Sequence, residues 1–487
     1  MSEKLRVKIA LTILLLTSIH PAEAQKKVSS KVSTKAIESY NRGIELATAG
    51  RFEEAITAYR EAIKLKPDFA EAHNNLGNIY EKTGDHEAAV ESFRQAVRAN
   101  AAFAEAHYNL GIALLSLKRV EEAAESFAAA IRLRPAFAEA HYNAGVAYAL
   151  VSRHKESAES YTRAIQLKPV YMEAYLGLAD ALLRLNRHAD AIEAYRNALA
   201  LKSDLAEAHY GMGLACAHLN RLKEAIEAMN RAVQLRPDLI EARINLGASY
   251  FASGKYRESV DAYLQAIRID ANRADLHFNL GRAMESANQH AEAIEAYGKA
   301  IQLRADFWEA HNAIGIACAQ AGRHEEAAEA FKRAVEIKPD FAEAHNNLGV
   351  TCSTLKRYEQ AAAAFAQATR IKPDYVEAHF NLGLTESRLE RHKEAVECFR
   401  QAARLKSDFA EAYYNAGVEL GIQSLWQEAV ESYLQAVRIK SNYIDARYNL
   451  ALVYRNLGNR EAAMEQCEAI KSLDAELAKK LSELILK

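Results

Sequence analysis

The sequence predicts an all-α protein: an α-solenoid of thirteen 34-residue helix-turn-helix repeats, followed by a C-terminal capping helix. The first observation is the stretch FAEAHNNLG, which occurs at 69–77 and again at 341–349, and this separation of 272 residues is eight times 34. Related stretches occur in the same register at every intermediate step. A fixed period of this length indicates a solenoid in which each unit packs on its neighbours.

The second observation is that the register continues through most of the chain. The repeats start at residues 35, 69, 103, 137, 171, 205, 239, 273, 307, 341, 375, 409 and 443, so that the array covers 35–476. Only seven prolines occur, which suits a nearly all-helical protein. One continuous core is therefore expected instead of several globular domains.

The amino terminus, 1–24, reads as a secretory signal peptide. Cations at Lys4, Arg6 and Lys8 precede an apolar run at 9–19, and residues 22–24 have A-x-A form. The run is about half of the roughly 20 residues that a permanent membrane anchor needs. We expect cleavage after Ala24, a flexible lead at 25–34, and export to the periplasm or secretion.

One repeat, 69–102, illustrates the pattern of the others. Small and apolar residues recur at helical spacing before and after a break at 83–85, which predicts two amphipathic helices. The apolar positions are Ala72, Leu76, Gly77 and Tyr80 in the first helix and Ala89, Val90, Phe93, Ala96 and Val97 in the second. The Gly77 position is Gly in eleven repeats and Ala in two, which predicts a close helix contact. The tail, 477–487, has an apolar face and is expected to form the capping helix.

These residues resemble the tetratricopeptide repeat family. The resemblance rests on the 34-residue period, Leu76-Gly77, Tyr80 and the residues of the second helix, and on the prolines that end six repeats. His73 departs from the family pattern, which prefers tryptophan at this position. The resemblance implies a right-handed superhelix whose first helices line a concave groove for protein ligands. The array is also similar to the superhelical region of O-linked N-acetylglucosamine transferases, without a catalytic domain.

The candidate site is a row of asparagines on the first helices, next to a row of aromatic residues. The asparagines, which the resemblance places in the groove, are Asn41, Asn75, Asn109, Asn143, Asn245, Asn279, Asn347, Asn381, Asn415 and Asn449. The aromatics are Tyr40, Tyr108, Tyr142, Tyr210, Phe278, Phe380, Tyr414 and Tyr448. An amide both donates and accepts hydrogen bonds, so such a row is suited to binding a peptide backbone. Two alternatives stay open: the amides bond the neighbouring repeat, or they persist only through duplication.

Composition and motifs argue against several other functions. The 62 basic and 64 acidic residues give a net charge of −2, which favours neither nucleic acid nor an anionic membrane as a partner. The five cysteines have no CxxC spacing, and fourteen of the sixteen histidines fall in two repeat registers, so no metal site is expected. Catalytic and phosphate-binding motifs are absent from the sequence, and we expect no enzymatic activity and no cofactor.

The resulting hypothesis is an exported, non-enzymatic scaffold that binds extended protein segments and, in a bacterium, helps to assemble envelope or secretion complexes. The alternative is a targeting or regulatory subunit of a glycosyltransferase whose catalytic domain is on another chain. An acidic residue recurs at the Glu71 position in twelve repeats. Two interpretations apply to it: stabilisation of the helix amino terminus, or a stripe for a basic ligand.

Overall fold

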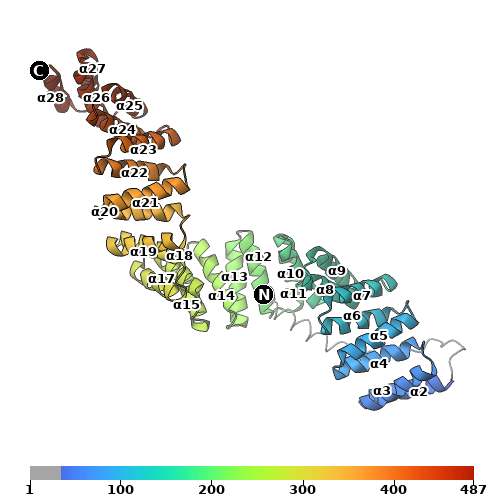
Figure 1. Cartoon of the computed structure of the whole chain (residues 1–487). Helices are drawn as coiled ribbons and strands as arrows, with labels where there is room; N and C mark the ends of the chain where they lie inside the picture. Colours follow the sequence, from blue (N-terminus) through green and yellow to red (C-terminus); the bar gives the residue numbers. More distant parts are fainter. Residues whose placement is uncertain (1–33, 487) are drawn as a thin grey trace. The chain divides into compact units, whose positions relative to one another are not determined.

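The computed structural model describes residues 34–486, and over this range every regular element is an α-helix (Figure 1). The expected signal peptide, 1–24, and nearly all of the lead, 25–34, lie outside the described residues. The helices divide into two compact units, Met1–Ser253 and Gly254–Lys487, which are described separately. The all-α repeat solenoid predicted from the sequence is confirmed, whereas the right-handed superhelical course remains a prediction.

The first unit contains six complete helix pairs and the first helix of a seventh. Its helices are α2 (Thr34–Thr48), α3 (Phe52–Leu65), α4 (Ala70–Thr83), α5 (His86–Ala99), α6 (Ala104–Ser116), α7 (Val120–Leu133), α8 (Ala138–Leu150), α9 (His154–Leu167), α10 (Met172–Arg184), α11 (His188–Leu201), α12 (Ala206–His218), α13 (Leu222–Leu235) and α14 (Ile240–Ala252). Each even-numbered helix is the first of its repeat and each odd-numbered helix is the second.

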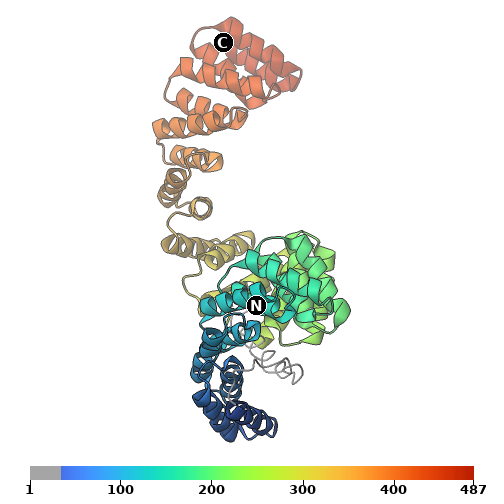
Figure 2. The same ribbon diagram turned by 90° about the vertical axis from the view of Figure 1, so that its right-hand side faces the viewer.

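The second unit begins with the second helix of the seventh repeat and ends with the capping helix. Its helices are α15 (Tyr256–Ile269), α16 (Ala274–Ser286), α17 (His290–Leu303), α18 (Trp308–Gln320), α19 (His324–Ile337), α20 (Ala342–Thr354), α21 (Tyr358–Ile371), α22 (Val376–Arg388), α23 (His392–Leu405), α24 (Ala410–Ile422), α25 (Trp426–Ile439), α26 (Ile444–Asn456), α27 (Arg460–Lys471) and α28 (Ala475–Leu486). Figure 2 shows how successive helices lie side by side within each unit.

The turn between the two helices of each repeat is built on one left-handed residue. Gly84 holds this place after α4 with φ +85°, and an equivalent residue with positive φ follows every first helix in the described range. Eight of the thirteen are not glycine; they are Lys118, Ser152, Asn186, Asn220, Asn288, Lys356, Glu390 and Ser424. Because a left-handed conformation is costly for most residues, the packing of the helix pair must hold these turns in place.

In most repeats the glycine register packs against the aromatic ring of the second helix in the same repeat, and at Gly213 the partner is Met229. A Cβ atom added at Gly77 would lie 2.7 Å from Phe93 Cε1, and one added at Gly349 would lie 2.6 Å from Phe365 Cε1. The close contact predicted at this register is thus, in most repeats, a ring against a bare backbone. Ala451 is one of the two exceptions, and in its repeat the small Cys467 occupies the position at which most other repeats have an aromatic ring.

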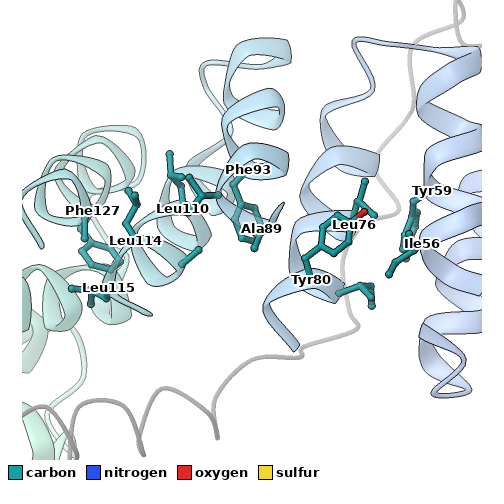
Figure 3. Close-up of a cluster of buried hydrophobic side chains, with 14 of the residues drawn as sticks. Ile56, Tyr59, Leu76, Tyr80, Ala89, Phe93, Leu110, Leu114, Leu115 and Phe127 are labelled. Carbon is teal, nitrogen blue, oxygen red and sulfur yellow. The ribbon is translucent and has the colours of Figure 1, made fainter. Parts of the chain in front are cut away.

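The core is continuous from one repeat to the next within a unit. Figure 3 shows part of it in the first unit, where Tyr59, Leu76, Phe93, Leu110 and Phe127 belong to one cluster of buried side chains drawn from four repeats. At the other end of the chain, Ala478, Leu481 and Ile485 of α28 cover the last repeat. The capping helix begins at Ala475, two residues before the boundary expected from the sequence. In the described range, no helix combines the length and apolar character needed to cross a bilayer.

Candidate functional site

The ten asparagines lie at the same position of ten first helices, five in each unit, and within each unit the surface that carries them is called the amide face below. Asn143 is buried at 5 % exposure, Asn41 is exposed, and the other eight are half-buried. Their depth follows from the helix register, since Asn75 is only one residue before the buried Leu76 and two before Gly77. The amides are therefore partly covered by neighbouring side chains.

Six of these amides donate a hydrogen bond to the first helix of the preceding repeat. Asn75 Nδ2 donates to Tyr40 Oη at 3.0 Å, and the same bond joins Asn143 to Tyr108, Asn245 to Tyr210 and Asn449 to Tyr414, at 2.9 to 3.3 Å. Asn109 and Asn381 donate to the side-chain oxygens of Asn74 and Asn346. One of the interpretations left open by the sequence, bonding to the neighbouring repeat, is therefore observed.

Two of the amides donate to their own helix, and Asn245 does so at 2.8 Å to the Glu241 carbonyl in addition to its bond to Tyr210. Phe380 precedes Asn415, and Asn415 Nδ2 donates to the Glu411 carbonyl of its own helix at 2.8 Å. An asparagine amide has two N–H groups and one carbonyl oxygen. A single inter-repeat bond therefore leaves hydrogen-bonding capacity on each amide for a ligand.

The aromatic residues expected in the groove pack between repeats. The ring of Tyr40 lies 5.9 Å from Tyr59 of its own repeat and 4.8 Å from Phe69 at the start of the next. Tyr108, Tyr142, Phe278, Phe380 and Tyr414 have equivalent pairs of ring contacts. Tyr448 is half-buried against the cluster under the capping helix. These rings join repeats, and in four cases their hydroxyl groups receive the asparagine bond.

The interruptions at Gly177 and Gly211 are filled by tyrosines of the preceding second helices. A Cβ atom at Gly177 would lie 2.4 Å from Tyr161 Cζ, and one at Gly211 would lie 2.2 Å from Tyr195 Oη. Tyr195 Oη donates to Asp180 Oδ1 at 2.6 Å. In these repeats a buried phenol ring thus occupies the space that a side chain at the asparagine position would take.

Sequence reasoning missed these tyrosines, although a signal was present. Each interruption follows a repeat whose second helix has Tyr at the Phe93 position, namely Tyr161, Tyr195 or Tyr297, whereas every Phe at that position is followed by an asparagine. Three other tyrosines at this position, Tyr59, Tyr263 and Tyr433, are followed by an asparagine. Tyr59 and Tyr433 interact with that asparagine. Burial raises the pKa of both hydroxyls, and the hydrogen bonds from Asn75 and Asn449 oppose that rise.

The histidines that replace the family tryptophan tie each repeat to the turn before it. His73 Nε2 donates to the Pro67 carbonyl at 2.8 Å. Equivalent bonds are made by His107, His141, His209, His277, His311, His345 and His379. Arg243 and Arg447 donate to the same carbonyl position through Nε. Burial lowers the pKa of His141 and of His345, with the carbonyl bond opposing the shift.

The hydrogen bond between the histidine and the preceding turn leads to a prediction for one substitution. His379→Phe removes the 3.0 Å bond to the Pro373 carbonyl and should lower the free energy of unfolding by about 0.5 to 1.5 kcal/mol. His379→Arg should leave stability nearly unchanged, because Arg243 and Arg447 make the same bond elsewhere. Urea unfolding followed by circular dichroism measures both variants. Equal loss in both would show that ring packing, and not the hydrogen bond, stabilises this position.

The acidic row at the Glu71 position is partly paired within the protein. Carboxylates at this position contact the basic residue at the end of the second helix of the same repeat, as in Lys372–Glu343 at 3.7 Å. The other pairs are Arg134–Glu105, Lys168–Glu139, Arg236–Glu207 and Lys440–Glu411. The Lys372 ammonium also lies 5.0 Å from the ring of Tyr375 in the next repeat. In these five repeats the acidic residue has a basic partner, which weakens the interpretation as a stripe for a basic ligand.

The cysteines and histidines are distributed as the repeat pattern predicts. Cys216, Cys318, Cys352 and Cys467 are buried, Cys398 is half-buried, and all five thiols are free. Burial raises the pKa of the Cys352 thiol. Within residues 34–486, no three side chains of the ligand-forming types gather in a geometry that would hold a metal ion.

The fold and the amide face together define a helical-repeat protein that presents the same side chains at regular intervals. Sequence profiles described as TPR repeat match 45–84, 247–287, 315–353, 354–389 and 423–458. Profiles described as tetratricopeptide repeat match 80–136, 108–171, 151–205 and 176–240, as well as 274–307, 376–409 and 444–477. The chain belongs to the tetratricopeptide repeat family.

Comparison with solved structures gives partial similarities. YrrB, described as a TPR protein with an unusual peptide-binding site, is 26 % identical over 38 % of this chain and 96 % of its own, with a TM-score of 0.35. MamA is 29 % identical over 33 % of this chain and 94 % of its own, with a TM-score of 0.32. Cut9 in the APC/C hetero-tetramer Cut9-Hcn1 is similar over 93 % of this chain and 97 % of the compared chain at 14 % identity, with a TM-score of 0.31. The search of curated proteins gives no match.

Proposed function

We propose that this protein is an exported scaffold whose amide face binds extended segments of other proteins. Membership in the tetratricopeptide repeat family supports a protein–protein interaction scaffold. The finer proposal rests on one observation: successive repeats present an amide at the same place, and the preceding repeat fixes its orientation in six cases. A row of oriented amides is suited to binding a peptide backbone without reading its side chains.

The spacing of the row supports an extended ligand. Packed helices step by about 10 Å, and an extended chain rises by about 3.3 Å per residue, so each amide would meet roughly every third ligand residue. One helical turn beyond the amides, Val350 and Leu384 expose 44 % and 40 % of their surface. These apolar side chains supply contact area beside the amides of α20 and α22.

The experiment that tests this proposal places a photocrosslinker on the amide face. p-Benzoyl-phenylalanine at Val350 should crosslink to extended segments of partner proteins in the native compartment, and the crosslinked peptides should lie in regions without regular structure. The same group at Gln367, an exposed position on the second helix α21, is the matched control. Equal yields at both positions would refute a binding role for the amide face.

The proposed compartment is the periplasm or the exterior, where the scaffold would help to assemble envelope or secretion complexes. Support comes from the basic residues, apolar run and A-x-A sequence at 1–24. Mass measurement of the mature protein should identify Gln25 as its first residue. Recovery of the protein from the cytoplasm with Met1 intact would refute the proposal of export.

A further inference from the structure

A cavity of about 600 Å³ lies in the first unit, between the second helices α9 and α11 and over the first helix α10. None of the ten asparagines of the amide face lines this cavity. Its apolar lining includes Tyr175, Leu178 and Leu182 of α10, and its walls carry charged residues of α9 and α11. Its volume falls in the range of about 300 to 1,000 Å³ that is usual for ligand sites.

Two of the lining side chains hold positions that are bridged by a hydrogen bond at some other junctions of the array. At two other junctions, a polar side chain of the second helix reaches a tyrosine of the next repeat: Arg60 Nη2 donates to Tyr80 Oη at 2.6 Å, and Asn230 Nδ2 donates to Tyr250 Oη at 3.1 Å. Thr162 and Leu182 hold the same two positions at the cavity. Thr162 Oγ1 donates to the Ala158 carbonyl of its own helix at 2.8 Å, so no bond crosses the space.

The two walls differ in how their charges are paired. On α11, Arg187 Nε donates to Asp190 Oδ2 at 2.7 Å, and Glu193 accepts from Arg196 at 2.6 Å. The α9 wall carries two cations, Lys155 and Arg163, and one acidic residue, Glu159.

The two cations of the α9 wall, Lys155 and Arg163, lack carboxylate partners in the part of the chain that the structure describes. Arg163 Nη1 donates to the neutral side chain of Gln166 at 3.0 Å. Among the residues that the structure describes, neither Lys155 nor Arg163 has a carboxylate within ion-pair distance. The α9 wall therefore has an excess of positive charge beside an apolar floor, whereas the charges of the α11 wall neutralise one another.

We propose that this cavity is a second binding site, which takes a bulky apolar side chain next to an acidic residue in a segment of a partner protein. The apolar side chain would lie on Leu178 and Leu182, and the adjacent carboxylate would face one of the two cations, Lys155 or Arg163. An apolar anchor in a pocket with a polar rim is the usual arrangement of a strong contact between proteins. The cavity contains none of the asparagines of the amide face. The two sites are therefore separate, and the scaffold would hold two partners at once.

A closed variant provides the sharpest test. Thr162→Arg combined with Leu182→Tyr installs the pair that already joins two repeats of this chain as Arg60 and Tyr80, so the variant should fold while the cavity is bridged. A phage library of random dodecapeptides is first depleted on the closed variant and then selected on the wild-type protein. Affinities of the selected peptides are measured by fluorescence anisotropy, and circular dichroism melting checks each variant. Thr162→Arg alone, at an exposed position, replaces the double variant if the latter does not fold.

The expected survivors share a bulky apolar residue next to Asp or Glu and bind the closed variant at least tenfold more weakly. In the double variant Lys155→Gln with Arg163→Gln, binding should no longer depend on the acidic residue of the peptide. It should still depend on the bulky apolar residue. Replacing asparagines of the amide face by alanine should leave the affinity for these peptides unchanged. This result would distinguish binding in the cavity from the proposed function of the amide face. The inference is overturned if no peptide survives depletion, if survivors bind the closed variant equally well, or if they lack the apolar–acidic pair.

Discussion

Replacing Asn347, Asn381, Asn415 and Asn449 together by alanine is expected to weaken binding of an extended peptide by about 2 to 6 kcal/mol. Each lost neutral hydrogen bond contributes about 0.5 to 1.5 kcal/mol, and the four amides lie on consecutive first helices of the second unit. The ligand is a peptide identified by crosslinking at position 350, and calorimetric titration gives the affinity of wild type and variant.

The structure requires a control for stability in this experiment. Two of the four amides also join repeats, since Asn381 donates to Asn346 and Asn449 donates to Tyr414. Tyr414→Phe removes one of these inter-repeat acceptors while keeping every amide, so it reports the cost of the structural bond alone. Urea unfolding of all three proteins shows whether folding has changed. Unchanged peptide affinity in a folded quadruple variant would show that the asparagine row is structural or merely inherited.

Gly349→Leu is expected to destabilise the second unit by about 3 kcal/mol or more, near the upper end of the cost of overpacking. The reason is the ring of Phe365, whose Cε1 and Cδ1 atoms would lie 2.6 and 2.7 Å from the new Cβ. Phe365 is 1 % exposed and has little room to move. Unfolding should broaden, because repeats next to the altered one lose a packing surface while distant repeats keep theirs.

Gly298→Leu is the matched control for this substitution. Gly298 lies within α17 of the same unit, and a Cβ atom there would have no neighbour within 4 Å. Since leucine favours a helix by somewhat less than about 1 kcal/mol relative to glycine, the control should be as stable as wild type or slightly more stable. Hydrogen exchange would localise the loss in Gly349→Leu to α20 and α21. A similar effect of both substitutions would contradict the ring contact as the cause.

Several features could be predicted from the sequence because they repeat at a fixed spacing. The helix expected from Ala72 to Tyr80 lies within α4, and the break at 83–85 coincides with the left-handed Gly84. The glycine register was correctly attributed to close packing, although its partner is a ring and not a crossing helix backbone. Local helix propensity, capping and apolar periodicity depend on residues within about one helical turn of each other. These short-range preferences can therefore be recognised from the sequence alone.

What the tertiary structure decided is how side chains of different repeats meet. Asn75 contacts Tyr40, 35 positions away, whereas Asn415 donates to its own helix and follows a repeat that has Phe380 in place of the tyrosine. In the same way, Tyr195 occupies the space beside Gly211, and a cavity lined in part by Thr162 and Leu182 stays open. The period identifies which positions face one another, but the rotamers and the remaining space depend on how each helix packs against its neighbours. Those distances arise only when the repeats are assembled, which is why the orientation of the amides and the second site were not evident from the sequence.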